Sequence, residues 1–297
     1  MMAVSEKQLE TWSHQGSITQ SSTTYQAVRQ VLEAGGSAYS GRDTTIFLQG
    51  SYGNDTNIFA DSDVDVVIEL TSTFYTDLSQ LSADDRATYD AQRTPATYSW
   101  QEFKTGVLNQ LSAQYGGDVT VGRKAISIAA NGGRRSVDVV PAAEFRKYLS
   151  FESATRHRYV SGICFWTPDG TLIVNYPRLH SDNCTAKHQA TAGWFKPTVR
   201  IFKNMRNAMI VEGRLKDGDA PSYFIEGLLW NVPDHLFGGS YLNTVVACLN
   251  WILQCDRTAL LCANEQYVLC YPDSPVTWTA EALDRFLNAA VDYWNDV

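Results

Sequence analysis

Residues 63–70 (DVDVVIEL) join two aspartates to a run of β-branched and apolar residues. The run predicts a buried strand over Val64–Leu70. Side chains alternate between the two faces of a strand, so Asp63 and Asp65 lie on one face and the valine between them lies on the other. Two carboxylates at that spacing repel each other unless a cation lies between them, and Mg²⁺ suits such oxygen ligands. The segment therefore predicts a core strand that carries a metal site.

A third acidic residue, Asp138, lies in a second predicted strand over Arg135–Val140. The valines on either side of it face the core, so its carboxylate lies on the opposite face. Three carboxylates from two strands can hold two ions. One ion activates an attacking hydroxyl, and the other stabilises the leaving phosphates.

Gly50 and Ser51 follow a short predicted strand over Thr45–Gln49 and open a turn. A glycine lets the backbone approach a phosphate closely, and a serine hydroxyl and backbone N–H groups can bind its oxygens. The turn is therefore a candidate site for a triphosphate.

The acidic segment has two other interpretations. An EF-hand loop that begins at Asp61 is excluded, because its sixth and twelfth positions would be Val66 and Ser72 instead of glycine and glutamate. A solvated edge strand is the simpler alternative for an isolated pair of aspartates. The upstream glycine–serine turn and the downstream Asp138 together favour the metal site.

The overall composition limits the class of partner. A formal charge of −8 and a pI near 5.1 argue against binding to a long nucleic acid, which needs a basic surface. A hydrophobic content of 44% predicts a packed interior. No apolar run is long enough to cross a bilayer, and residues 1–17 lack the apolar segment of a secretory signal. We therefore expect no membrane partner and a cytoplasmic protein with six reduced cysteines.

Predicted strands dominate the first part of the chain, and predicted helices follow Pro177. This order predicts an α+β fold with a catalytic core over 1–176 and a helical lobe over 177–297. The other predicted elements are a helix over 5–33, a helix and a loop within 71–99, a helix over Trp100–Tyr115, a strand over Val119–Ala129, a turn at Asn131–Gly133, a hairpin over Ile163–Tyr176, and helices near 186–210, 221–231, 240–255 and 278–294.

The spacing of Gly50, Ser51, Thr56, the D-V-D pair and Asp138 resembles that of the DNA polymerase beta-like nucleotidyltransferases. Later segments are similar to bacterial cyclic GMP-AMP synthase-like enzymes, the CD-NTase family. These segments are SGICFW (161–166), NYPRLH (175–180), FKPTVRIFKN (195–204) and PSYFIEGLLWNVP (221–233). The similarity extends to about residue 235. It implies a polymerase beta-like core, with a mixed β-sheet and an N-terminal spine helix, and a C-terminal helical lobe that closes the active-site cleft.

The resemblance also implies roles for individual residues. Asp63, Asp65 and Asp138 would bind two Mg²⁺ ions, with Mn²⁺ as a substitute. Gly50 and Ser51 would bind the donor triphosphate.

Three residues of the predicted helical lobe receive roles in the same way. Lys203 resembles the lysine that neutralises the triphosphate. It shares a helix face with Lys196 and Arg200, for which a solvated cationic face is the alternative. Ser222 and Tyr223 resemble the pair that touches the phosphates and stacks on a base, and core packing is the alternative for the tyrosine.

The implied reaction is attack of a ribose hydroxyl on the α-phosphorus of a nucleoside triphosphate, with release of pyrophosphate. A second, intramolecular step would close a cyclic dinucleotide. ATP and GTP are the expected substrates and cyclic GMP-AMP the favoured product. The resemblance places such a messenger in bacterial antiphage (CBASS) signalling, where it activates a separately encoded effector protein, with no nucleic acid required.

Several alternatives stay open at this point. The aspartates equally suit a nucleotidyltransferase that modifies an RNA, a protein or a small molecule, and a nucleic-acid sensor or a catalytically silent nucleotide-binding module is a further option. A zinc site at His180, Cys184 and His188 lacks an evident fourth ligand. The sequence alone does not specify the bases, the linkage, the ring size or the activating signal.

Overall fold

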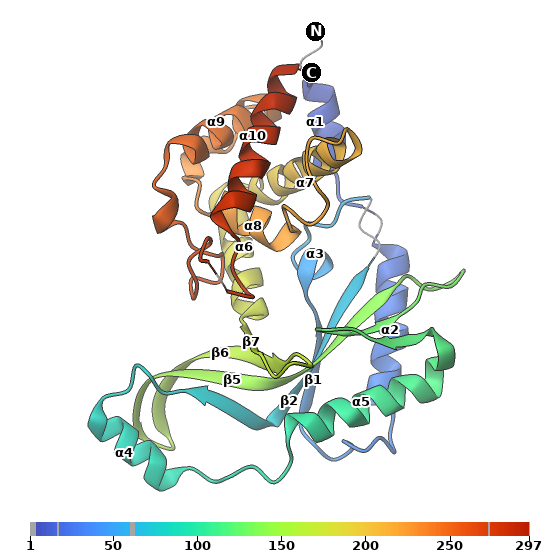
Figure 1. Cartoon of the computed structure of the whole chain (residues 1–297), viewed down its shortest axis with the longest axis vertical. Coiled ribbons are helices and arrows are strands. Elements are labelled where there is room, and N and C mark those ends of the chain that lie inside the picture. Colours follow the sequence, from blue (N-terminus) through green and yellow to red (C-terminus); the bar gives the residue numbers. More distant parts are fainter. Residues whose placement is uncertain (1–3, 17, 60–62, 273, 297) are drawn as a thin grey trace. The chain divides into compact units, whose positions relative to one another are not determined.

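The computed structural model shows two compact units, each assembled from separate segments of the chain (Figure 1). The residues described are 4–16, 18–59, 63–272 and 274–296. The sheet unit comprises Ile18–Gln49 and Ser62–Pro177. The helical unit comprises Met1–Ser17, Gly50–Asp61 and Arg178–Val297. The segment that begins at Gly50 therefore packs with the C-terminal helices, although strands of the sheet unit flank it in sequence.

The sheet unit is built on a seven-stranded mixed sheet with the order β1-β2-β5-β4-β3, and β6 and β7 extend from β5 on a branch. Its strands are β1 Thr44–Leu48, β2 Val64–Asp77, β3 Val119–Val121, β4 Ile126–Ile128, β5 Val137–Ser153, β6 Arg156–Trp166 and β7 Leu172–Asn175. Its helices are α2 Thr19–Glu33, α4 Ala83–Gln92 and α5 Trp100–Tyr115, followed by a short 3₁₀ turn, Gly116–Asp118. The α+β class is confirmed.

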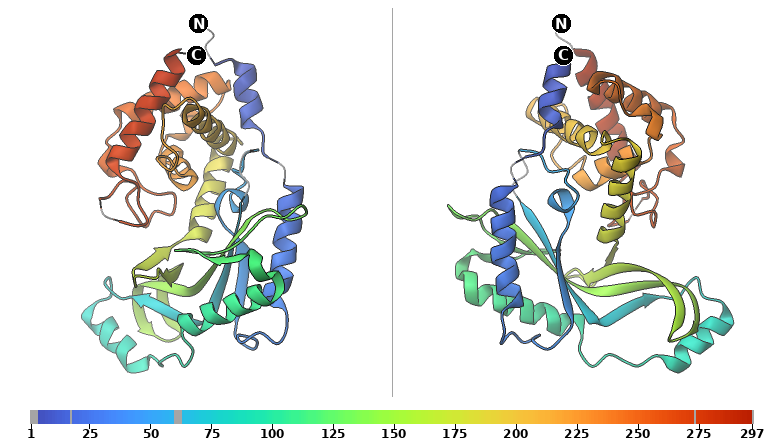
Figure 2. Two further views of the ribbon diagram at one scale, coloured as in Figure 1. Left: turned by 45° about the vertical axis from the view of Figure 1, so that its right-hand side comes forward. Right: turned by 180° about the vertical axis from the view of Figure 1, so that it is seen from behind.

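Strands β2 and β5 form the parallel centre of this sheet, and the predicted strand over Val64–Leu70 is confirmed as the first half of β2. Its apolar side chains are fully buried, as a central strand requires. The helices α2 and α5 contact each other and pack on these strands (Figure 2). The long β2–β5 pair thus provides a rigid base for side chains on its other face.

Two predicted boundaries in the sheet unit are wrong. Residues 71–77, expected to leave the sheet, continue β2 to Asp77, because their threonine and aromatic side chains suit a half-exposed strand. The strand expected over Val119–Ala129 is a hairpin of β3 and β4, in which the N–H of Gly122 donates to the carbonyl oxygen of Ala125. By contrast, the helix over Trp100–Tyr115 is confirmed, and a Ser99–Glu102 capping box sets its start.

The helical unit packs its helices around one apolar core. They are α1 Glu6–Ser13, α3 Gly50–Gly53, α6 Pro177–Ala190, α7 Phe195–Val211, α8 Ser222–Trp230, α9 Tyr241–Gln254 and α10 Ala280–Asp296, with short 3₁₀ turns at Asp234–Leu236 and Arg257–Ala259. The predicted apolar face of α7 is confirmed, because Phe195, Val199, Phe202 and Met209 are all fully buried. In the part of the chain that the structure describes, no helix is long and apolar enough to cross a membrane.

The single helix expected over 5–33 is wrong. Helix α1 ends at Ser13, and the next residue, His14, is extended with a ψ of 143°. At Gly16 the backbone passes so close to Ile58 that an added Cβ would lie 2.5 Å from the Ile58 carbonyl oxygen. A side chain at this position would therefore clash with the backbone of Ile58. Helix α1 belongs to the helical unit and α2 to the sheet unit.

The single helix expected near 186–210 is also two helices, α6 and α7. Ala192 and Gly193 between them have positive φ values of 48° and 90°. A left-handed pair of residues ends an α-helix, and glycine favours that conformation. After this break, α7 runs in a new direction, and its cationic face contacts the segment after α3, as described below.

Candidate active site

Two of the three predicted metal ligands are direct neighbours in the sheet. Asp65 on β2 is the register partner of Asp138 on β5, in a parallel pairing that also aligns Val64 with Val137. Register partners on adjacent parallel strands point to the same face, with the strands about 4.8 Å apart. The valines are buried on the opposite face, and both aspartates stay partly exposed. The alternation expected from the sequence is therefore observed.

Serine hydroxyls hold two of the acidic side chains. Asp63 lies just before β2, is exposed, and accepts a hydrogen bond at Oδ1 from the hydroxyl of Ser136. Asp138 accepts at Oδ1 from the hydroxyl of Ser127 on β4, at 2.6 Å. Two carboxylates side by side and a third within two residues offer the hard oxygen donors that Mg²⁺ and Mn²⁺ prefer. The donor set thus fits divalent ions.

The predicted phosphate turn begins one residue after Gln49, whose backbone is hydrogen-bonded to β2. The N–H of Gln49 donates to the carbonyl oxygen of Asp65 at 3.0 Å, and α3 begins at the next residue. Gly50 has a φ of 64°, a left-handed conformation that glycine adopts without strain. Backbone N–H groups of Asn54 and Thr56 then donate to the carbonyl oxygens of Gly50 and Ser51. The chain therefore folds back tightly right after β1.

The cationic face of α7 binds the segment that follows this turn. Lys196 Nζ donates to Asp55 Oδ2 at 3.1 Å, and Arg200 Nη1 donates to the carbonyl oxygen of Asp55 at 2.7 Å. Lys203, which is fully buried, donates from Nζ to the carbonyl oxygen of Thr56 at 2.9 Å. The alternative of a solvated cationic face is therefore wrong. The predicted role of Lys203 at the triphosphate stays a prediction.

A buried carboxylate, that of Glu226 on α8, also binds this segment. Its Oε2 accepts from Asn54 Nδ2 at 2.8 Å and lies 2.7 Å from His180 Nε2, and its Oε1 accepts from the hydroxyl of Thr56. Burial alone would raise the pKa of Glu226. The hydrogen bond and charge of His180, the charge of Lys203 and the Thr56 hydroxyl outweigh it and hold the pKa below its usual value.

Sequence reasoning missed Glu226 and assigned His180 only to an alternative. The available signal was an acidic residue inside the apolar run FIEGLLW (224–230) on a predicted helix. A glutamate in such a run is almost never left without partners when it is buried. Nothing in the sequence, however, indicated that its partners would lie about 170 residues away, just after the glycine–serine turn.

The other two predicted substrate contacts also lie at the start of α8. Ser222 Oγ accepts from Arg206 Nη1 at 3.2 Å. The ring of Tyr223 stacks on His180, with centroids 4.5 Å apart, and its hydroxyl accepts from Asn264 Nδ2 at 2.8 Å. Both side chains thus have protein partners within the helical unit, and their roles at a nucleotide stay predictions.

The three residues of the zinc alternative, which lacked an evident fourth ligand, do not form one cluster. His180 and Cys184 are joined by Glu226, with ligand atoms all within 4.8 Å of one another. His188 instead accepts at Nδ1 from the backbone N–H of Lys196. Both oxygens of Glu226 already accept hydrogen bonds, so we assign no metal to this buried group.

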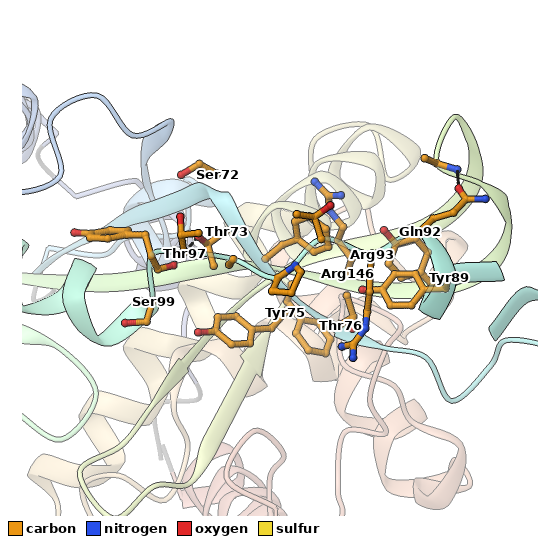
Figure 3. A pocket seen from close by; sticks show the side chains of 18 of the residues that line it. Ser72, Thr73, Tyr75, Thr76, Tyr89, Gln92, Arg93, Thr97, Ser99 and Arg146 are labelled. Atoms are coloured by element: carbon orange, nitrogen blue, oxygen red, sulfur yellow. Dashed lines mark hydrogen bonds between the residues drawn. The ribbon is translucent and has the colours of Figure 1, made fainter. Parts of the chain in front are cut away.

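A separate hollow of about 1110 Å³ lies within the sheet unit (Figure 3). Aromatic side chains line it, among them Tyr75, Tyr89 and Tyr148. Of its two arginines, Arg93 and Arg146, the second is paired with both oxygens of Glu144 and lies over the ring of Phe74. The hollow includes none of the predicted site residues.

Comparison with known proteins gives a consistent result. A family model described as the cGAS/DncV-like nucleotidyltransferase C-terminal helical domain matches residues 182–295. The cyclic UMP-AMP synthase of Rhodothermus marinus is 38% identical over 295 residues, which cover 99% of this chain and 98% of the relative. The cyclic nucleotide synthase CdnE01 of Staphylococcus haemolyticus is 37% identical over 302 residues, covering 99% of this chain and 100% of the relative.

A solved structure is similar over the same extent. It is the Rhodothermus marinus CdnE c-UMP-AMP synthase with Apcpp and Upnpp, which matches with a TM-score of 0.87 and 37% identity. The match covers 99% of this chain and 97% of that one. The similarity therefore includes both the strands with the aspartates and the helices of the second unit.

Proposed function

The chain belongs to the cGAS/DncV-like nucleotidyltransferases, enzymes that make cyclic nucleotides, and we propose that it joins two nucleoside triphosphates into a cyclic dinucleotide. The observation that carries the proposal is the direct register pairing of Asp65 with Asp138, with Asp63 two residues away. Binding a nucleotide does not require such a like-charge pair, whereas metal-assisted transfer does. The silent-module alternative is disfavoured for that reason.

Asp63, Asp65 and Asp138 would hold two divalent ions, which polarise the attacking hydroxyl and stabilise the charge on the leaving pyrophosphate. Ser136 and Ser127 orient two of these carboxylates through the hydrogen bonds described above. The protein would align the attacking hydroxyl with the α-phosphorus. Such alignment of bound reactants accounts for a large share of the rate enhancement in enzymes.

The donor triphosphate would bind at Gly50 and Ser51, where a left-handed glycine opens a tight turn. Lys203 would contribute positive charge near this turn, since its ammonium group already contacts the segment at Thr56. Ser222 and Tyr223 would contact the nucleotide as the resemblance implies. The second round uses the same groups, with the linear dinucleotide as both donor and acceptor.

The base composition of the product is the finer part of the proposal. The expectation of cyclic GMP-AMP is not confirmed by the relatives compared above. A relative 38% identical is named cyclic UMP-AMP synthase, which supports UTP and ATP as the first pair to test. A cyclic product would serve as a messenger for a separately encoded effector protein in antiphage signalling. The net charge of −8 supports activity without nucleic acid.

The test is incubation of the purified protein with all four labelled nucleoside triphosphates and Mg²⁺ or Mn²⁺, followed by phosphatase treatment. A phosphatase-resistant product that the Asp63→Asn/Asp65→Asn variant does not make supports a cyclic product, and omission of single nucleotides identifies the bases. A labelled RNA, protein or small molecule in cell extract would instead support an acceptor-modifying enzyme. Nucleotide binding with no product under either condition would refute the proposed synthesis.

A further inference from the structure

The segment Asn54–Asn57 lies between the predicted phosphate turn and the strand with the predicted metal ligands, and three of its four side chains are buried, whereas that of Asp55 is exposed. Asn54 is 5% exposed, and Thr56 and Asn57 are both 0% exposed. Loops normally keep their polar groups in water. A buried polar loop is stable only when every group has a partner, so these contacts determine the shape of the segment.

The partners come from several helices of the helical unit. The cations of α7 bind the carbonyl oxygens of residues 55 and 56 and the carboxylate of Asp55, as described above. Glu226 on α8 accepts from the side chains of Asn54 and Thr56. The hydroxyl of Ser181 on α6 adds a bond to the carbonyl oxygen of Gly53.

Two backbone hydrogen bonds connect the residues bound by Glu226 to the Gly50–Ser51 turn. The N–H groups of Asn54 and Thr56, the two residues that Glu226 holds, donate to the carbonyl oxygens of Gly50 and Ser51 at 3.0 and 2.9 Å. One carboxylate thus fixes the side chains of the two residues whose amides close the phosphate turn. A displacement of Asn54 or Thr56 would therefore displace the backbone of Gly50 and Ser51.

His180 holds this carboxylate in place. Its Nε2 lies 2.7 Å from Glu226 Oε2, the imidazole is 2% exposed, and it stacks on the ring of Tyr223. A buried carboxylate with three hydrogen-bonding partners has little freedom to rotate, and losing one partner leaves charge without compensation.

We propose that Glu226, oriented by His180, is a positioning residue that sets the geometry of the Gly50–Ser51 turn through Asn54 and Thr56 and thereby controls affinity for the donor nucleoside triphosphate. The inference rests on the proposed function of that turn. Glu226 contacts no substrate in this scheme and acts only through the two loop residues.

The experiment compares Thr56→Val with Thr56→Ser, which differ in the hydroxyl that reaches Glu226. Thr56→Val removes the hydrogen bond in a similar volume, and Thr56→Ser keeps it. Glu226→Gln is the second test, because it keeps the shape of the side chain and removes its charge. Asn231→Ala is the matched control, since Asn231 makes three hydrogen bonds at the end of the same helix but none to the 54–57 segment.

The readouts are KM and kcat for each nucleotide, calorimetric affinity for a non-hydrolysable triphosphate, and the melting temperature. We expect Thr56→Val and Glu226→Gln to raise KM and the dissociation constant roughly tenfold, the loss of one charge-assisted hydrogen bond, with kcat changed by about twofold or less. Thr56→Ser should behave as the parent protein. Asn231→Ala should lower the melting temperature without changing KM.

Unchanged affinity in both Thr56→Val and Glu226→Gln would overturn the proposal, and so would an equal loss of affinity in Asn231→Ala, which would indicate general loosening of the unit. A Glu226→Gln variant that does not fold leaves Thr56→Val to decide. Ser51→Ala separates the two levels of inference. If it does not weaken triphosphate binding, the proposed donor turn is wrong, whereas if it alone weakens binding, only the role of Glu226 is wrong.

Discussion

Replacing Asp65 by asparagine should remove catalysis and at the same time stabilise the metal-free protein. Asp65 and Asp138 are register partners on parallel strands, so their carboxylates lie on one face about 4.8 Å apart in strand spacing. Two unit charges at about 5 Å repel by roughly 1 kcal/mol in a water-like dielectric and roughly 3 kcal/mol at an effective dielectric constant of about 20. Both side chains are partly exposed, which favours the lower value.

The expected gain is therefore about 1 kcal/mol, or roughly 2–4 °C in melting temperature for a unit of this size. The same substitution removes one ligand of the two proposed metal ions. Mg²⁺ should therefore raise the melting temperature of the parent protein and leave the melting temperature of Asp65→Asn unchanged. At a Mg²⁺ concentration ten times the dissociation constant, the shift in the parent corresponds to about 1.4 kcal/mol.

The assay is differential scanning fluorimetry with and without Mg²⁺, combined with the cyclic-product assay. Asp77→Asn is the control, because it makes the same change at the far end of the same strand, outside the aspartate pair. A melting temperature that falls in Asp65→Asn without Mg²⁺ would refute the like-charge argument. An equal Mg²⁺ response in the two variants would refute the metal assignment.

Two further predictions concern protonation. The folded pKa of Glu226 lies below its usual value, so its stabilising contribution is fully present above about pH 4.3, the ordinary glutamate pKa, and is lost as the pH falls through the folded value. The difference in melting temperature between the parent and Glu226→Gln should therefore be constant from about pH 6 to about pH 8 and shrink in acid. A difference that grows in acid would contradict the predicted direction of this pH dependence. Burial raises the pKa of the Cys164, Cys248 and Cys262 thiols to about 12, so they should resist a disulfide reagent in native protein at pH near 8 and react after denaturation, whereas rapid native labelling of these residues would contradict their burial.

The sheet and its acidic face were predictable because they depend on local alternation. Period two in 63–70 separates aspartates from valines with no knowledge of the partner strand, and the same holds around Asp138. The boundaries that were wrong depend on contacts distant in sequence. Gly16 lies close to Ile58 just after α1 ends, and no pattern within residues 5–33 encodes that contact.

The cationic face of α7 shows why side-chain pattern alone underdetermines function. Its spacing of four and three residues was visible in the sequence, and a solvated face was the ordinary interpretation. The outcome depended on a break at Ala192 and Gly193 that separates α7 from α6, and on a segment some 140 residues upstream that supplies the acceptors. Lys203 in particular is fully buried, and its ammonium group finds an acceptor in the carbonyl oxygen of Thr56, as a buried charge requires.

The boundary between the two units falls directly before the predicted phosphate turn. Gln49 is tied to the backbone of Asp65 in the sheet unit, and the next residue, Gly50, begins a segment that packs with the helical unit. The turn proposed to bind the triphosphate therefore follows directly on Gln49, whose N–H group is hydrogen-bonded to the strand that carries Asp65, whereas buried charged groups of helices α7 and α8 bind the segment just after the turn. Under this proposal, substitution of Glu226, which is far in sequence from the three predicted metal ligands, should change donor affinity while leaving those ligands intact. That separation of affinity from metal-dependent chemistry distinguishes this arrangement from a helical unit that only contributes stability.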